Sequence, residues 1–175
     1  MIRKFRTGLR LALAALFLLS APLYPLPAFA AAGNWTVYAN AKLQSWGAAH
    51  NIGTDTYVLV LLTMSYSPTV NTDATWAEIS SFEASCPGYS AGGSTATMSK
   101  ALATGVVTVS MTAVSWASST CTVKYAVIVR RAGGSLVSGD KLLAYVDLNT
   151  ASGSSTVSTT NGTLQVTAAS GVFTQ

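Results

Sequence analysis

The sequence predicts a mainly β fold, an antiparallel sandwich or a jelly-roll-like barrel with one or two short helices near the mature N-terminus. First, only 9% of the 175 residues are charged, against roughly 25% in average soluble domains. Second, Ser and Thr supply most of the polarity, and apolar runs rich in Val and Thr recur along the chain, which favours sheets over disorder. Third, turn residues separate these runs at short intervals.

The segment at residues 1–30 has the three-part layout of a secretory signal peptide. Four basic residues and no acid lie in residues 1–10, an unbroken apolar run fills residues 11–19, and three prolines follow. Ala28-Phe29-Ala30 places small residues where signal peptidase cleaves, so we expect cleavage after Ala30. A retained membrane anchor is the alternative, although the run is shorter than the about 20 residues that a spanning helix needs.

Export follows from this segment, to the periplasm, the cell surface or the medium, with membrane contact only through residues 1–30 if they stay uncleaved. Residues 31–175, the expected single β-rich structural domain, hold six basic and six acidic side chains and are formally neutral. The net charge of +4 therefore belongs to the N-terminus. A neutral domain gives no support to nucleic-acid binding, which needs a basic surface, so no nucleic-acid partner is expected.

The chain has two cysteines, Cys86 and Cys121, both in the part expected to be exported. An oxidising compartment favours a disulfide between them. Two buried free thiols are the alternative, since free cysteine is among the most buried residue types.

The first expected elements are a helix and a buried strand. Residues 35–49 predict a short amphipathic helix that Thr36 caps and Gly47 ends. Residues 57–64 (YVLVLLTM) form a continuous apolar run, which is typical of a strand buried on both faces.

A second short helix is expected over residues 74–84, where Trp76, Ile79 and Phe82 share one face. Asp73 occupies the N-cap position of this helix.

The remaining elements are strands, because apolar and small polar residues alternate or form solid apolar runs. A short turn is expected at residues 117–120. The expected strands cover residues 106–114, 121–131, 141–148, 163–167 and 172–173.

Residues that could support catalysis are few. His50 is the only histidine, and its place beside a turn predicts an exposed loop residue and not a base. The chain contains no Gly-rich phosphate loop, and one histidine with two distant cysteines does not complete a zinc site. We therefore expect no catalytic residues, no metal and no cofactor.

The acidic residues leave one alternative open. Glu78 and Glu83 fall on different faces of the expected helix, and Asp140 and Asp147 lie at opposite ends of a strand. A glycosidase-type carboxylate pair is not eliminated by these positions. A turn role for Asp55 and Asp140, and a solvated helix position for Glu78, are the simpler interpretations.

The four tryptophans have two interpretations. Trp76 and Trp116 lie among apolar neighbours, which favours core packing. Sugar stacking by Trp35 and Trp46 is the alternative.

The order of several motifs resembles a family of small tailed-phage virion proteins. The pattern extends over residues 34–173, and its combination is more specific than any single piece. Its parts are Asn34-Trp35-Thr36-Val37-Tyr38, the segment at 55–80, GYSAGG at 88–93, KYAVIVRR at 124–131, LLAYVDL at 142–148 and STTNGTLQVT at 158–167.

This resemblance implies a non-enzymatic structural subunit, capsid decoration-like, with no catalytic residues. The signal peptide and the cysteine pair depart from a protein assembled in the cytoplasm. We therefore expect a subunit of a virion or of an extracellular assembly that presents a Ser/Thr-rich surface and associates with itself or with capsid or filament subunits. A secreted cell-surface binding or adhesion module is the alternative, and a secreted hydrolase ranks third.

Overall fold

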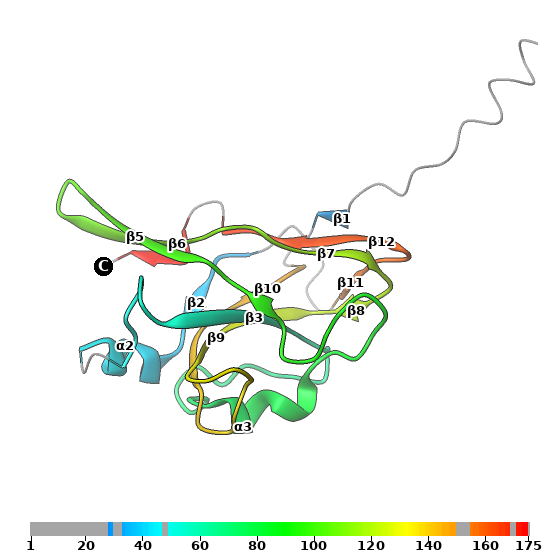
Figure 1. Ribbon diagram of the computed structural model, residues 1–175, viewed down its shortest axis with the longest axis horizontal. Coiled ribbons are helices and arrows are strands. Elements are labelled where there is room, and N and C mark those ends of the chain that lie inside the picture. The colour runs from blue at the N-terminus through cyan, green and yellow to red at the C-terminus, as the bar shows by residue number, and fades with distance from the viewer. Residues whose placement is uncertain (1–27, 30–32, 47–48, 150–154, 169–170, 175) are drawn as a thin grey trace, which may run out of the picture.

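The computed structural model describes residues 28–29, 33–46, 49–149, 155–168 and 171–174. Within these ranges the protein is mainly β, with small antiparallel sheets and two short helices, which confirms the predicted fold class. The arrangement is sandwich-like: in Figure 1, strands β5, β6, β7 and β12 lie on one side of a central sheet and helices α2 and α3 on the other. Jelly-roll connectivity stays a prediction, as does the extent of the domain.

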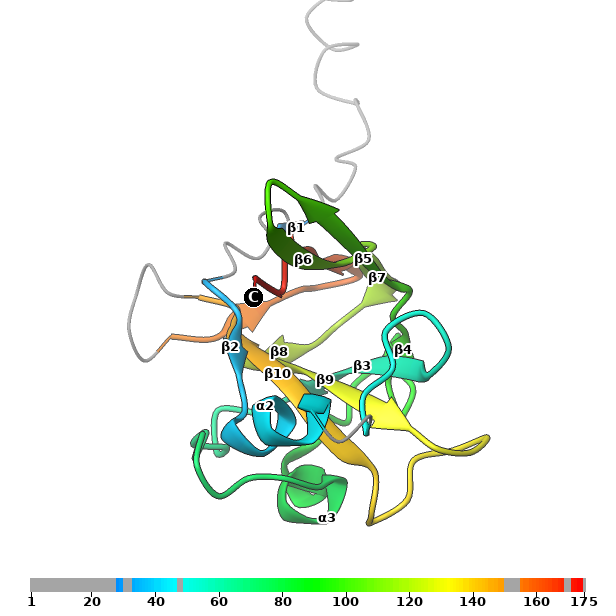
Figure 2. The same ribbon diagram turned by 90° about the vertical axis from the view of Figure 1, so that its left-hand side faces the viewer.

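The central sheet has five antiparallel strands in the order β2-β10-β9-β3-β4. Its three long strands come from the apolar runs of the sequence, and six of the seven residues of β3 are buried. Burial on both faces follows because helices cover one face and other strands the opposite face (Figure 2). The strands are β2 (Thr36–Val37), β10 (Lys141–Asp147), β9 (Tyr125–Arg131), β3 (Thr56–Leu62) and β4 (Ser94–Thr95).

The covering strands form smaller sheets. Strand β7 (Val114–Ser119) pairs with β12 (Gly162–Val166), whose other edge pairs in parallel with β1 (Ala28–Phe29). Strand β6 (Val106–Met111) lies between β5 (Met98–Ala103) and β13 (Phe173–Thr174). A short pair joins β8 (Thr122–Val123) to β11 (Val157–Ser158).

Two strand predictions and one turn prediction were wrong. The expected strand at 121–131 is two strands, because β8 pairs with β11 whereas β9 belongs to the central sheet. The expected strand at 106–114 is two strands, because the chain leaves one sheet after Met111 and enters another at Val114. The expected turn at 117–120 is mostly strand, since β7 continues to Ser119. Ser119 is buried there, and its hydroxyl lies 2.8 Å from that of Thr159. The polar residues that suggested a turn are therefore strand residues, and the side chain of Ser119 has a hydrogen-bond partner inside the fold.

Both helix starts also differ from the predictions. Helix α2 covers Ala39–Trp46, and the expected cap Thr36 lies in strand β2 instead. Gly47, the expected end of this helix, lies outside the described residues.

Helix α3 covers Trp76–Ile79 and continues as a 3₁₀ turn over Ser80–Phe82. Its N-cap is Thr75, whose backbone N–H donates to the Glu78 carboxylate at 2.8 Å. Asp73 is therefore not the cap. It is buried and accepts hydrogen bonds from the Tyr66 hydroxyl at 2.7 Å and the Thr69 N–H at 2.8 Å.

Core packing was predicted for Trp76 and Trp116, and the structure agrees. Trp76 and Trp116 are buried in the core, and Trp35 is partly buried against it. The side chain of Trp46 lies outside the described residues.

The predicted signal peptide lies almost wholly outside the described residues, Ala30 included. Only Ala28–Phe29 is described, as β1 on the edge of β12. None of the helices in the described ranges is long and apolar enough to cross a membrane.

Candidate functional site

Each of the six acidic side chains in the described part of the chain accepts a hydrogen bond within the fold. Glu78 caps α3, whereas Glu83 binds a separate loop, so the two acids have different partners. Among the described residues no cluster of three or more His, Cys, Asp or Glu could hold a metal ion. The acids and the residues that donate to them are Asp55 with Asn51 and Arg130, Asp73 with Tyr66 and Thr69, Glu78 with Ala74 and Thr75, Glu83 with Tyr89 and Gly92, Asp140 with Ala132 and Val137, and Asp147 with Asn149.

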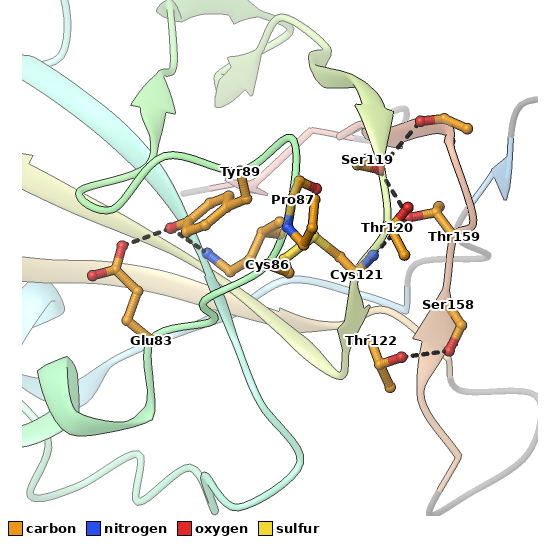
Figure 3. Close-up of a disulfide and its surroundings, with 12 residues drawn as sticks. Glu83, Cys86, Pro87, Tyr89, Ser119, Thr120, Cys121, Thr122, Ser158 and Thr159 are labelled. Atoms are coloured by element: carbon orange, nitrogen blue, oxygen red, sulfur yellow. Dashed lines mark hydrogen bonds between the residues drawn. A yellow bond between two sulfur atoms is a disulfide. The ribbon is translucent and has the colours of Figure 1, made fainter.

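The disulfide Cys86–Cys121 is present, as predicted, and joins the corner after α3 to the end of β7 (Figure 3). Hydrogen bonds support the same junction. The Thr120 N–H donates to the Pro87 carbonyl at 2.9 Å, and the Cys121 N–H donates to the Thr159 hydroxyl at 3.2 Å. This cluster holds three separated segments together and serves the architecture of the protein.

The corner at residues 88–93 is equally structural. The Tyr89 hydroxyl donates to Glu83 at 2.7 Å and accepts from the Leu61 N–H at 3.2 Å (Figure 3). Burial, followed by the hydrogen bond to Glu83, raises the pKa of the Tyr89 phenol well above its usual range. Gly93 lies against β3 so closely that a Cβ there would be 2.2 Å from the Leu59 carbonyl oxygen. The motif therefore fastens a loop to the central sheet.

A hairpin, residues 98–111, projects beyond the body of the protein (Figure 1). We call it the arm. All residues of β5 after Met98 are exposed, and Leu102 is 72% exposed. Consecutive positive φ angles at Thr104 and Gly105, 50° and 82°, form its two-residue turn. The sequence did not predict β5, because a strand exposed on both faces has no apolar alternation.

The outer edge of the arm is unpaired in the described part of the chain. Its sheet has the order β13-β6-β5, so β5 has a neighbour on one side only. Such an edge presents free N–H and C=O groups to another strand. Leu102 and Val106, which is 43% exposed, add apolar surface near the tip.

A pocket of about 180 Å³ lies between α2, the central sheet and the base of the arm. Its walls include Val37, Val109, Leu143 and Phe173, which come from four strands. Polar groups also line it: Lys42 and Ser45 from α2, Lys100 from β5, and His50.

His50 was expected to be an exposed loop residue, and this was wrong: it is only 8% exposed. Its ring packs on that of Tyr57, with centroids 6.2 Å apart, and its Nδ1 lies 3.5 Å from the Tyr57 hydroxyl. Its Nε2 is buried without a hydrogen-bond partner among the described residues. Burial, helped by the Arg130 guanidinium, lowers the pKa of His50 to about 4, so the ring is neutral at pH 7.

Two of the residues that line the pocket, Lys42 and Lys100, are exposed lysines. The described ion pairs are Lys124 with Asp147 at 3.7 Å and Arg130 with Asp55 at 2.7 Å. Lys42 and Lys100 form no ion pair within the described ranges, and both are exposed. Sequence reasoning missed this group, because its members come from distant parts of the chain and follow no motif spacing.

Comparison with known proteins adds no relative. No protein-family model, curated protein or solved structure matches the chain. The resemblance to tailed-phage virion proteins therefore stays a prediction, and functional inference rests on the geometry described above.

Proposed function

We propose that this protein is a non-enzymatic structural subunit of a virion or extracellular assembly, and that the arm makes its main contact with other subunits. The exposed arm is the observation that carries this proposal. Monomeric proteins usually protect sheet edges with charge, proline or a covering element. Strand β5 is six residues long, contains no proline, and has Lys100 as its one charged side chain.

A second copy of this chain is the partner that the arm fits best. Two β5 strands that pair antiparallel about Ala101 would place Lys100 of one copy opposite Leu102 of the other. No like charges then face each other, and both free edges are satisfied in one symmetric contact. Leu102 of each copy would at the same time lose part of its contact with water.

Two further observations support the proposal. The six side-chain carboxylates all accept hydrogen bonds inside the fold, so each of them has a structural role. The disulfide agrees with export, because such bonds persist in oxidising compartments. Assembly after export is thus consistent with the chemistry of the chain.

Sedimentation analysis of the exported protein over a range of concentrations tests the proposal. We expect reversible association, and electron microscopy at high concentration should show ordered particles or filaments. The variant L102S/V106S should weaken association at least tenfold, because it removes apolar contact area at the tip. The control is Leu43→Ser on α2, since Leu43 is also 72% exposed but lies outside the arm.

A protein that stays monomeric at every concentration and binds no capsid or filament would contradict the proposal. Equal effects of L102S/V106S and Leu43→Ser would contradict the role of the arm. Binding to a different chain through the arm would keep the structural function but replace the self-association.

A secreted binding module is the second candidate, and the pocket is the observation that favours it. Trp35, by contrast, packs partly buried against the core, which weakens the case for sugar stacking. A glycan array with wild type and Trp35→Ala would test sugar binding directly.

A further inference from the structure

Strand β12 has one edge that is covered, in the described part of the chain, only by residues of the predicted signal peptide. On one side β12 pairs with β7, and on the other it pairs in parallel with the two residues of β1. Both residues of β1 precede the predicted cleavage point after Ala30. Cleavage there would remove β1 and leave N–H and C=O groups along this edge of β12 without a protein partner.

The first described residues of the expected mature chain are committed to a different sheet. The Gly33 N–H donates to the Asp147 carbonyl at 2.9 Å, and β2 pairs with β10. These residues therefore lie on the edge of the central sheet, to which β12 does not belong. Because residues 33–37 are held there, they leave the edge of β12 open to a strand of another molecule.

The composition around β12 favours a second copy of this chain as that molecule. Asp147 is the last charged residue of the sequence, and residues 148–175 contain no Lys, Arg, Asp or Glu. Strand β12 also contains no proline. Charge and proline are the usual protection of a sheet edge, and without them two β12 strands approach each other without repulsion.

Antiparallel pairing of two β12 strands about Leu164 is self-complementary. Thr163 of each copy then lies opposite Gln165 of the other, so polar, half-buried side chains face each other. Leu164 lies opposite Leu164 of the second copy, which gives an apolar contact at the centre. One symmetric contact would thus satisfy both free edges.

The position of β12 allows this contact to form beside the arm contact. In Figure 1 the arm projects from one end of the molecule, and β1 and β12 lie toward the other end. Contacts at two separate edges let each copy hold two neighbours at the same time, as a particle or a filament requires.

We propose that removal of the signal peptide uncovers the edge of β12, and that this edge then pairs with β12 of a second copy. Before cleavage, β1 covers the edge and prevents this pairing. The inference rests on the proposed function, to which it adds a second contact and the processing step that controls it.

Sedimentation analysis of the exported L102S/V106S protein isolates the β12 contact, because this variant weakens the arm contact. We expect it to form reversible pairs and no larger species. Addition of Thr163→Lys and Gln165→Lys should weaken the pairing at least tenfold, because the proposed register places like charges opposite each other. The matched control, Thr163→Lys with Gln165→Glu, places opposite charges at the same positions and should pair within threefold of the unchanged edge. Both variants alter the same two half-buried side chains, so damage to the fold would affect both alike.

A second measurement tests the cover that β1 provides. A foreign signal peptide placed directly before residue 28, with Ala30→Tyr to remove the native cleavage point, exports a protein that keeps residues 28–29. In the L102S/V106S background this protein should pair at least tenfold more weakly than the form that begins at residue 31.

Equal pairing by the two charge variants, or undiminished pairing by the protein that keeps residues 28–29, would overturn the proposal. N-terminal sequencing that finds residues 28–29 in the native exported protein would do the same. If wild type associates and L102S/V106S stays monomeric at every concentration, the β12 contact is refuted and the arm contact stands. A wild type that is itself monomeric contradicts the proposed function as well, so the two failures are distinguishable.

Discussion

Removal of the disulfide should cost about 4 kcal/mol of stability. The perturbation is the double variant Cys86→Ala/Cys121→Ala, which breaks the link without leaving a reactive thiol. The two cysteines are 35 residues apart. For a closed loop of that length, the chain-entropy relation gives about 13 cal/mol/K, or about 4 kcal/mol at 25 °C.

The folded corner should survive this change. The Thr120 N–H still donates to Pro87 at 2.9 Å, and the Cys121 N–H still donates to Thr159 at 3.2 Å. The loss therefore comes mainly from the greater freedom of the unfolded chain. Cys121 is buried, so its truncation to Ala adds a small packing loss.

Urea unfolding of wild type and the double variant, followed by circular dichroism, measures the difference. The midpoint should fall, and the denaturant slope should rise because an uncrosslinked chain exposes more surface. Wild type in excess reductant should behave like the double variant. A loss below about 1 kcal/mol, or two free thiols titrated in the native exported protein, would refute this reasoning.

Three further predictions concern other parts of the fold. The pKa of His50 is about 4 in the folded protein against 6.5 when unfolded, so the unfolded chain binds the extra proton first. Stability should therefore fall by about 3 kcal/mol between pH 6.5 and pH 4, a loss that denaturant titrations should find in wild type but not in His50→Phe. Gly93→Ala should prevent stable folding because its Cβ meets the Leu59 carbonyl, whereas Gly92→Ala, with φ 88° and open space, should cost only about 1–2 kcal/mol in thermal melts. Asp140→Ala should cost about 1–3 kcal/mol in urea titrations, since two backbone N–H groups lose their acceptor.

The central sheet was predictable because its signal is local. Strands β3, β9 and β10 contain continuous apolar runs. A strand that is buried on both faces needs apolar side chains at successive positions, so its run is visible in the sequence. The arm was not predictable for the opposite reason. Strand β5 buries almost nothing, so no pattern in its side chains records that it is a strand.

The helix starts show a second limit. Thr36 and Asp73 are both suitable N-cap residues, yet each has another role in the fold. Thr36 pairs with strand β10 in the central sheet. The Asp73 carboxylate accepts hydrogen bonds from the Tyr66 hydroxyl and the Thr69 N–H. Tertiary contacts therefore override a local preference worth only about 1 kcal/mol.

By itself, the sequence determined the fold class and the buried strands, and it favoured the disulfide. Burial imposes a periodicity that can be read along the chain, and two cysteines leave a single intramolecular pairing. Only the tertiary structure decided the exposed arm and the pocket. The pocket has walls from a helix, a loop and several strands, and their packing against one another is encoded by no spacing in the sequence.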